Sequence, residues 1–246
     1  MAIKIDQIKY KEENMNGNNK KDEWDESYKN KDNYMFYPHE DVIRFISKYI
    51  AKRTGLKEFN SKYNSLDKIK VLDFGCGIGR HVRTLNEFNI DGYGFDLSSE
   101  AINIAKQNFQ ELGLLNLVEK VIIADITKLP YEDKYFNFML SHGVLDSMPY
   151  SIAKDGLLEL SRCLKDNGKI YFDVISEDGY ICSDNDFEKT ITTEHEKNTI
   201  QTYFNEDRID DLIKDVFVIE EIILKSSFNV VNKTTVARYH VVVKKL

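Results

Sequence analysis

The densest group of chemically informative residues is a glycine loop that follows a short apolar run. Positions 71 to 80 read Val-Leu-Asp-Phe-Gly-Cys-Gly-Ile-Gly-Arg, with glycines at Gly75, Gly77 and Gly79. Glycines at this spacing let the chain turn tightly after a strand, and they bring backbone N–H groups close to a ligand at the start of a helix. The segment therefore predicts a binding loop, whose ligand must be identified from the neighbouring residues.

The charges beside this loop favour a cationic ligand over a pyrophosphate. A dinucleotide fingerprint would place its third glycine at position 80, whereas Arg80 stands there and Gly79 comes early. Asp73 lies just before Gly75, where its carboxylate would repel a pyrophosphate and attract a cation. S-adenosylmethionine carries a sulfonium and an ammonium group and no phosphate. It therefore suits this strand end better than NAD does.

Further polar residues follow the next three apolar runs. Asp96 ends the second run, at the distance from Gly75 expected for a carboxylate that accepts hydrogen bonds from ribose hydroxyls. Asp125 follows the third run, and Ser141 follows the fourth. An isolated aspartate at such a position is commonly a turn or capping residue. The ordered series, with one such residue at the end of each run, predicts a single ligand site at one edge of a sheet.

His142 and Asp146 are the candidate catalytic residues, because both come directly after the fourth apolar run. Transfer of a methyl group to an oxygen or to an ammonium nitrogen requires removal of a proton. Histidine has a pKa suited to that role. Asp146 could act with His142, or it could instead bind an amine or hydroxyl of the substrate. No histidine or cysteine cluster has the spacing of metal ligands, so no metal is expected.

The spacing of apolar residues predicts the elements that position these groups. Apolar runs alternate with segments of helical period, as expected for a parallel sheet with helices on both faces. The expected strands are 69–74, 92–95, 121–124, 135–140 and 169–175, and the expected helices are 41–50, 79–88, 100–112, 149–164 and 207–214. Two final β-rich runs, 216–225 and 236–244, lie too close together for a helical crossover, which predicts an antiparallel hairpin.

The D-x-G-x-G-x-G spacing, the acidic strand ends and the terminal hairpin together resemble the class I S-adenosylmethionine-dependent methyltransferases, especially from Val71 to Gly143. The resemblance implies a Rossmann-like α/β fold with a seven-stranded, mostly parallel sheet that ends in an antiparallel hairpin and has helices on both faces. It also implies that S-adenosylmethionine is the cofactor. The cofactor contacts that it implies are Asp73, Gly75, Cys76, Gly77, Gly79, Arg80, Asp96, Leu97, Asp125, Ile126 and Ser141.

Two segments outside this core are expected to enclose the site. Residues 23–52 resemble the N-terminal lid of small-molecule methyltransferases, in which Trp24 and Tyr28 could cover the sulfonium by cation–π attraction. These two aromatic residues could equally pack a surface helix. Residues 176–205 form a polar insert that should lie over the strand ends and shape the acceptor pocket. The candidate substrate contacts in the two segments are Tyr37, His39, Tyr180 and Tyr203.

Length and composition limit the remaining possibilities. The 246 residues favour one domain, spanning 23–246, after a polar and flexible tail at 1–22. The net charge of −7 argues against nucleic acid and anionic membranes as partners. Three widely spaced cysteines, no signal peptide and no long apolar run are typical of a protein in the reducing cytoplasm. The oligomeric state cannot be predicted from these features.

Three functions remain open at this point. The sequence favours an enzyme that methylates an oxygen or nitrogen atom of a small-molecule or sugar-like acceptor. A protein that binds S-adenosylmethionine and serves as a non-catalytic partner would retain the same loop. An NAD-dependent oxidoreductase would share the sheet, but it would require a glycine at position 80 and no acidic residue at position 73.

Overall fold

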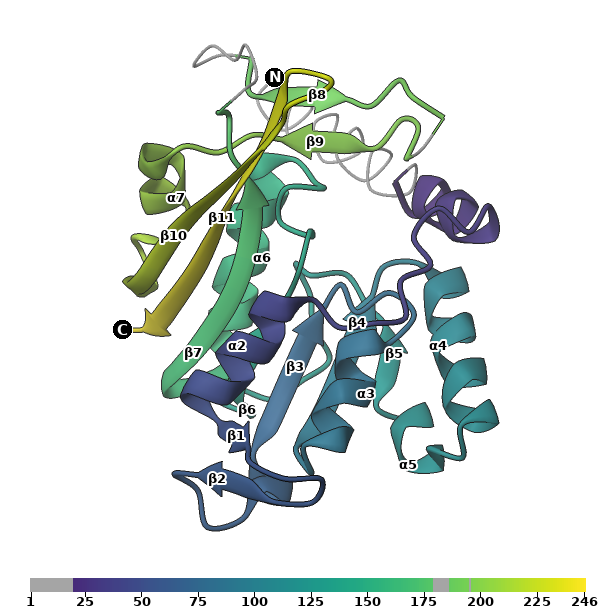
Figure 1. The fold of residues 1–246 in the computed structure, drawn as a ribbon, viewed down its shortest axis with the longest axis vertical. Coiled ribbons are helices and arrows are strands. Elements are labelled where there is room, and N and C mark those ends of the chain that lie inside the picture. Colours follow the sequence, from purple (N-terminus) through teal and green to yellow (C-terminus); the bar gives the residue numbers. More distant parts are fainter. Residues whose placement is uncertain (1–19, 179–185, 195) are drawn as a thin grey trace, which may run out of the picture.

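A computed structural model describes residues 20–178, 186–194 and 196–246. Its centre is a seven-stranded sheet with the order β10-β11-β7-β6-β3-β4-β5 (Figure 1). The strands, in chain order, are β3 (Lys70–Phe74), β4 (Asp91–Asp96), β5 (Val121–Ile123), β6 (Phe136–Leu140), β7 (Leu164–Ile175), β10 (Phe217–Asn229) and β11 (Thr234–Lys245). Strands β3 to β7 pair in parallel, and β11 runs antiparallel to both β7 and β10. The predicted fold class is confirmed.

Helices cover both faces of this sheet because its strand residues alternate in direction. Within β3, Val71 packs with α2 (Glu40–Tyr49) and α3 (Arg80–Glu87), whereas Leu72 packs with α6 (Tyr150–Cys163) and α7 (Glu206–Ile213). Successive residues of a strand point to opposite faces, so both faces of β3 are apolar and buried. The α4 helix (Ser99–Glu111) packs beside α3 through Phe109 and Val82.

Several short elements were not predicted from the sequence. They are β1 (Ala51–Arg53), β2 (Phe59–Ser61), η1 (Leu66–Lys68), α5 (Leu115–Val118), β8 (Glu188–Thr190) and β9 (Ile200–Thr202). The β1–β2 and β8–β9 pairs are two small antiparallel sheets in polar segments. Strands of three residues have no usable hydrophobic period, so their positions depend on contacts with the rest of the fold.

A helix at residues 20–29 precedes α2. Residues 20–22, which the sequence analysis assigns to the flexible tail, are helical because the helix docks onto the domain through Asp25 and Tyr28. Asp25 accepts hydrogen bonds from the Ser98 hydroxyl (2.6 Å) and from the Glu100 N–H (3.1 Å), and so caps the first turn of α4 from outside.

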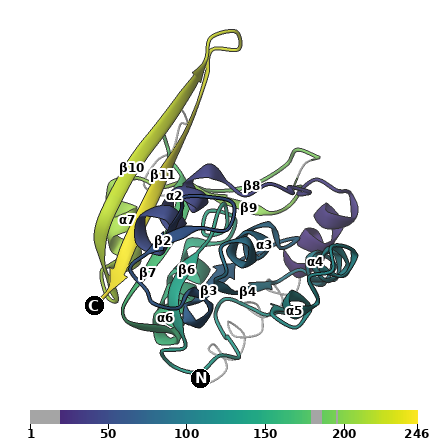
Figure 2. The same cartoon turned by 60° about the horizontal axis from the view of Figure 1, so that its bottom comes forward.

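The β10–β11 hairpin extends well beyond the rest of the sheet (Figure 2). The β11 strand pairs with β7 only from Arg238 to Lys244, whereas its pairing with β10 continues to Asn229 and Thr234. The turn is thus shorter than the sequence suggests. In the described ranges, no helix has both the length and the apolar character needed to cross a bilayer.

Candidate functional site

A cavity of about 550 Å³ lies at the carboxyl ends of β3, β4 and β6. Its volume is within the range of small-molecule and cofactor sites. The predicted site residues that line it are Trp24, Tyr28, Gly75, Cys76, Gly77, Arg80, Asp96, Leu97, Asp125, Ile126, His142 and Asp146. The cavity therefore brings together most of the predicted cofactor residues and both candidate catalytic residues.

The glycine loop forms one wall of the cavity with an unusual backbone. Gly75 has a φ of +67° and Gly77 a φ of +52°, both in the left-handed region that disfavours side chains. A Cβ at Gly75 would lie 2.4 Å from Val144 Cγ2, and one at Gly77 would lie 2.6 Å from the Tyr28 hydroxyl. The loop therefore accepts no side chain at either position. Its backbone lies directly against the cavity and against the 20–29 helix.

Asp96 is the buried carboxylate at the end of β4. Its Oδ2 accepts the Gly77 N–H at 2.8 Å, and its Oδ1 accepts the Ser98 N–H at 2.9 Å. Burial raises the pKa of Asp96 to about 6, and the nearby charges of Asp73 and Asp25 add to that effect, while the two N–H donors oppose it. Each carboxylate oxygen can accept a further hydrogen bond from a ligand that enters the cavity.

Asp73 lies behind this wall and does not line the cavity. It is fully buried, with its Oδ1 at 3.3 Å from His81 Nδ1, and its Oδ2 has no hydrogen-bond partner among the described residues. His81 Nε2 in turn accepts the His39 N–H at 3.3 Å. Asp73 therefore orders the junction between α3 and the chain before α2. Gly79 and Ser141, two other predicted cofactor contacts, are also absent from the cavity wall.

Asp125 is a turn residue that also lines the cavity. Its Oδ1 accepts the Thr127 N–H at 2.8 Å and the Thr127 hydroxyl at 2.7 Å, which is the pattern of a turn residue. It also lines the cavity next to Ile126 and Ala124.

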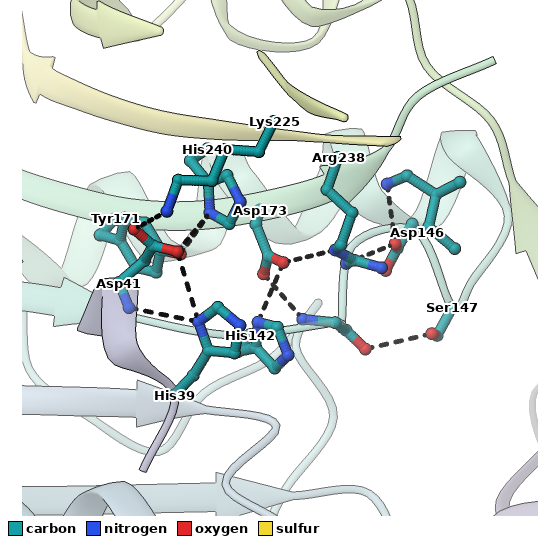
Figure 3. A network of polar contacts seen from close by, with 12 residues as sticks. His39, Asp41, His142, Asp146, Ser147, Tyr171, Asp173, Lys225, Arg238 and His240 are labelled. Atoms are coloured by element: carbon teal, nitrogen blue, oxygen red, sulfur yellow. Dashed lines mark hydrogen bonds and ion pairs between the residues drawn. The ribbon is translucent and has the colours of Figure 1, made fainter. Parts of the chain in front are cut away.

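The second end of the cavity holds a chain of ion pairs centred on Arg238 (Figure 3). Arg238 Nε donates to Asp173 Oδ2 at 2.6 Å, and its Nη2 donates to Asp146 Oδ2 at 2.7 Å. His142 Nδ1 lies 2.9 Å from the same Asp173 oxygen. Burial alone would raise the pKa of Asp173, but His142 and Arg238 hold that pKa well below its usual range. Asp173 is therefore an anion that both neighbours share.

His39 is stacked on His142, with ring centroids 3.8 Å apart and planes inclined by 18°. Burial and the neighbouring His142 lower the pKa of His39 to about 4, so His39 is neutral near pH 7. Beyond it, Asp41 Oδ1 accepts from Lys225 Nζ at 2.5 Å, and Asp41 Oδ2 lies 3.5 Å from His240 Nδ1. His39 thus holds the His142 ring in place, although His39 does not itself line the cavity.

The β9 strand of the 176–205 insert contacts the loop that follows β6. The Asp146 carbonyl accepts the Thr202 N–H at 2.8 Å and Gln201 Nε2 at 2.9 Å, and Gln201 also lines the cavity. Tyr203 is buried beside this contact and is not part of the wall. Tyr180 lies outside the described residues, and Tyr37, which is 82% exposed, does not line the cavity.

Asp173 and Arg238 are the functional residues that the sequence analysis missed. Asp173 interrupts an apolar run in β7, and Arg238 precedes an apolar run in β11. A charged residue within a strand that is buried on both faces must have a partner of opposite charge. The sequence therefore indicated that Asp173 and Arg238 each have such a partner. The identity of the partner was not available, because it depends on the register of β11 against β7, where Arg238 lies opposite Ile175.

The strand order, the glycine loop and the position of Asp96 define an α/β domain of the class I methyltransferase type. A family described as a methyltransferase domain matches residues 65–236, and the chain belongs to that family. A solved S-adenosylmethionine-dependent methyltransferase of Methanosarcina mazei superposes with a TM-score of 0.62 at 20% identity, covering 73% of this chain and 93% of that one.

Two curated relatives match shorter stretches. An uncharacterized protein of Methanocaldococcus jannaschii is 34% identical over 54% of this chain and 51% of its own length. A sterol 4-C-methyltransferase of Caenorhabditis elegans is 26% identical over 62% of this chain and 42% of its own length. The chain thus spans about half the length of the curated relatives that it matches.

S-adenosylmethionine is the cofactor of this family, and the residues present fit it. Gly75 and Gly77 place backbone without a side chain at the cavity, and the Asp96 carboxylate lines the same cavity with unused acceptor capacity. Trp24 and Tyr28 of the 20–29 helix line the same cavity.

Proposed function

We propose that the protein transfers a methyl group from S-adenosylmethionine to an oxygen or nitrogen atom of a small-molecule or sugar-like acceptor. The observation that carries the proposal is that one cavity is lined both by the glycine loop and Asp96 and by His142, whose Nδ1 lies against Asp173. Cofactor and acceptor would therefore meet in the same cavity, next to His142.

His142 is the residue that we assign as the general base. Asp173 lies against Nδ1, so it favours the tautomer with the proton on Nδ1 and leaves Nε2 as the basic nitrogen. The stacked ring of His39 limits rotation of that imidazole. Bound S-adenosylmethionine supplies an electrophilic methyl group, and His142 Nε2 accepts the proton that the acceptor loses. Fixed orientation and exclusion of water account for most of the remaining acceleration.

The size of the cavity supports a small acceptor. After the cofactor is bound, the remaining wall is formed by the loop that follows β6 and by residues such as Ile152 and Gln201 of α6 and the insert. A protein or nucleic-acid chain would need an open groove, and a nucleic acid would also be repelled by the net negative charge of this molecule. The sterol C-methyltransferase relative makes carbon methylation the alternative outcome to test.

Calorimetric titration with S-adenosylmethionine, S-adenosylhomocysteine and NAD tests the cofactor. We expect micromolar-range binding of the first two and no binding of NAD. Asp96→Ala removes hydrogen bonds to ribose and should weaken S-adenosylmethionine about tenfold or more. Asp155→Ala, which removes an exposed aspartate of α6, is the matched control and should leave the affinity unchanged. Binding of NAD instead, or of none of the three, would rule out the proposed cofactor site.

Transfer of a labelled methyl group separates an enzyme from a non-catalytic binding protein. Pools of small alcohols, amines and sterols are incubated with methyl-labelled cofactor, and the labelled products are assigned to oxygen, nitrogen or carbon. His142→Gln should lower the rate of transfer about 10²- to 10⁴-fold, as expected for loss of a general base, while cofactor affinity stays the same. Full activity of this variant would contradict the role of His142, and label on carbon would replace the proposed acceptor class.

A further inference from the structure

Only one of the two carboxylate oxygens of Asp146, at the proposed acceptor end of the cavity, has hydrogen-bond partners among the described residues. Its Oδ2 accepts the Ile175 N–H at 2.9 Å as well as the Arg238 guanidinium. Its Oδ1 is buried and has no hydrogen-bond partner among the residues that the structure describes, although Asp146 lines the cavity. A buried polar atom without a partner is costly, and such atoms in native proteins call for an explanation.

Contacts of both its side chain and its backbone fix the position of Asp146. Arg238 and the Ile175 N–H hold its side chain, and the contacts of Thr202 and Gln201 with the Asp146 carbonyl hold its backbone. Asp146 therefore cannot easily turn its free oxygen toward another donor of the protein. The oxygen is left without a hydrogen bond from the described residues, in a side chain that belongs to the cavity wall.

The charges around Asp146 favour a ligand whose hydrogen-bond donor is positively charged. Asp146 and Asp173 share a single arginine, Arg238, so these three residues together carry one net negative charge when both carboxylates are ionised. His39, on the far side of His142, adds no positive charge near pH 7 because its pKa is about 4. A carboxylate or phosphate on the acceptor would be repelled here, a hydroxyl would be tolerated, and an amine would be attracted.

Burial raises the pKa of Asp146, and the charge of Arg238 opposes this effect only in part. The ionised form of Asp146 is therefore under-solvated in the protein. A bound N–H donor would supply the missing interaction and stabilise that form.

We propose that Asp146 anchors the methyl acceptor and that the acceptor is a small amine whose N–H donates to Asp146 Oδ1. The inference rests on the proposed function and names its substrate class. The amine enters as an ammonium ion and loses one proton to His142 Nε2. The nitrogen lone pair then forms the bond to the methyl carbon as the carbon–sulfur bond breaks, and one N–H stays on Asp146 throughout.

Three shape-matched probes test this assignment on the full chain saturated with S-adenosylhomocysteine. They are 2-phenylethylamine, 2-phenylethanol and phenylacetate, whose rings suit apolar wall residues such as Val144, Met148 and Ile152. Binding is measured by ligand-observed NMR and calorimetry. We expect the amine to bind about tenfold tighter than the alcohol, and phenylacetate to bind more weakly than both.

Asp146→Asn should reduce binding of the amine to the level of the alcohol while the affinity for S-adenosylhomocysteine stays within about twofold of wild type. Asp155→Asn makes the same chemical change on the exposed surface of α6 and should leave the preference intact. Equal binding of amine and alcohol by the wild type would overturn the proposal, even if the Asp146 variant failed to fold. An unchanged preference in a folded Asp146→Asn protein would overturn it too. Failure of the wild type to bind S-adenosylhomocysteine would instead refute the proposed function.

Discussion

At the scale of single residues, the site depends on carboxylates whose surroundings differ. Asp96 is buried against two backbone N–H groups without a countercharge, whereas Asp173 is buried between His142 and Arg238. The same burial therefore raises the pKa of Asp96 and is overcome at Asp173, where the pKa is lowered. Cofactor binding and the proton-accepting site should consequently respond to pH in different ranges.

We expect the affinity for S-adenosylmethionine to fall as the pH drops below about 6, because ribose hydroxyls donate best to ionised Asp96. The limiting slope is about tenfold per pH unit. Calorimetry at pH values on both sides of this pKa measures it. Asp96→Asn, which cannot titrate, should bind more weakly and without this dependence. A wild-type affinity that is constant across this range would contradict the ionised form as the ligand.

The contribution of Asp96 to the free energy of unfolding should change with pH in the opposite direction to cofactor affinity. A folded pKa of about 6, above the ordinary 3.8 of the unfolded carboxyl, means that ionisation of Asp96 costs folding free energy. Its contribution is therefore favourable at low pH and is lost as the pH rises through 6. The difference in unfolding free energy between wild type and Asp96→Asn, measured in the absence of cofactor, should change in that sense.

At the scale of elements, the glycine loop depends on its contact with the 20–29 helix. Gly77→Ala introduces a Cβ at 2.6 Å from the Tyr28 hydroxyl, and it also strains a left-handed backbone at a cost of roughly 1 kcal/mol. We expect this variant to lose S-adenosylmethionine affinity about tenfold or more, measured by calorimetry. Tyr28→Phe in the same chain removes the nearest atom and leaves Tyr28 Cζ at 3.6 Å as the next one, so it should restore part of the affinity.

Gly113→Ala is the matched control for this experiment. Gly113 also has a left-handed backbone, with a φ of +72°, but a Cβ there would meet no atom within 4 Å. It should reduce stability by the strain alone and leave cofactor affinity unchanged. If Gly113→Ala and Gly77→Ala weaken binding equally, close approach of the 20–29 helix to the loop is not the reason for glycine at position 77.

Elements with a local signal were those that the sequence predicted well. The glycine loop, Asp96 at the end of β4 and Asp125 shortly after β5 depend on neighbours in the chain, so their positions followed from spacing alone. The β8–β9 pair and the Arg238 ion pairs form between segments that are separated in the sequence and meet only in the folded protein. No local sequence pattern predicts them. Asp73 was wrongly placed by such a local signal. It occupies a clear position in the motif, but it lies behind the cavity wall and does not line the cavity.

At the scale of the whole molecule, the C-terminal strand completes the acceptor end of the cavity. Arg238 of β11 connects Asp173 of β7 to Asp146 in the loop after β6. Antiparallel pairing of β11 with β7 places this arginine at the site, and the register between the two strands begins at Arg238. The final strand of the chain is therefore part of the functional site as well as of the sheet.

Arg238→Gln should destabilise the protein by roughly 3–5 kcal/mol, because it leaves two buried carboxylates without their shared cation. Urea denaturation measures this loss. Arg44→Gln, which removes an arginine that is 71% exposed and pairs with Glu40 and Asp41, is the matched control and should cost no more than about 1 kcal/mol.

The loss at Arg238 should also depend on pH. In the wild type the pKa of Asp173 lies below its usual value, so its favourable contribution is present above about pH 4 and is lost only as the pH falls further. In Arg238→Gln, Asp146 and Asp173 should take up protons at higher pH, so the stability difference from wild type should shrink as the medium becomes acidic. A difference that does not vary with pH would show that packing of the arginine side chain, and not its charge, joins the C-terminal strand to the site.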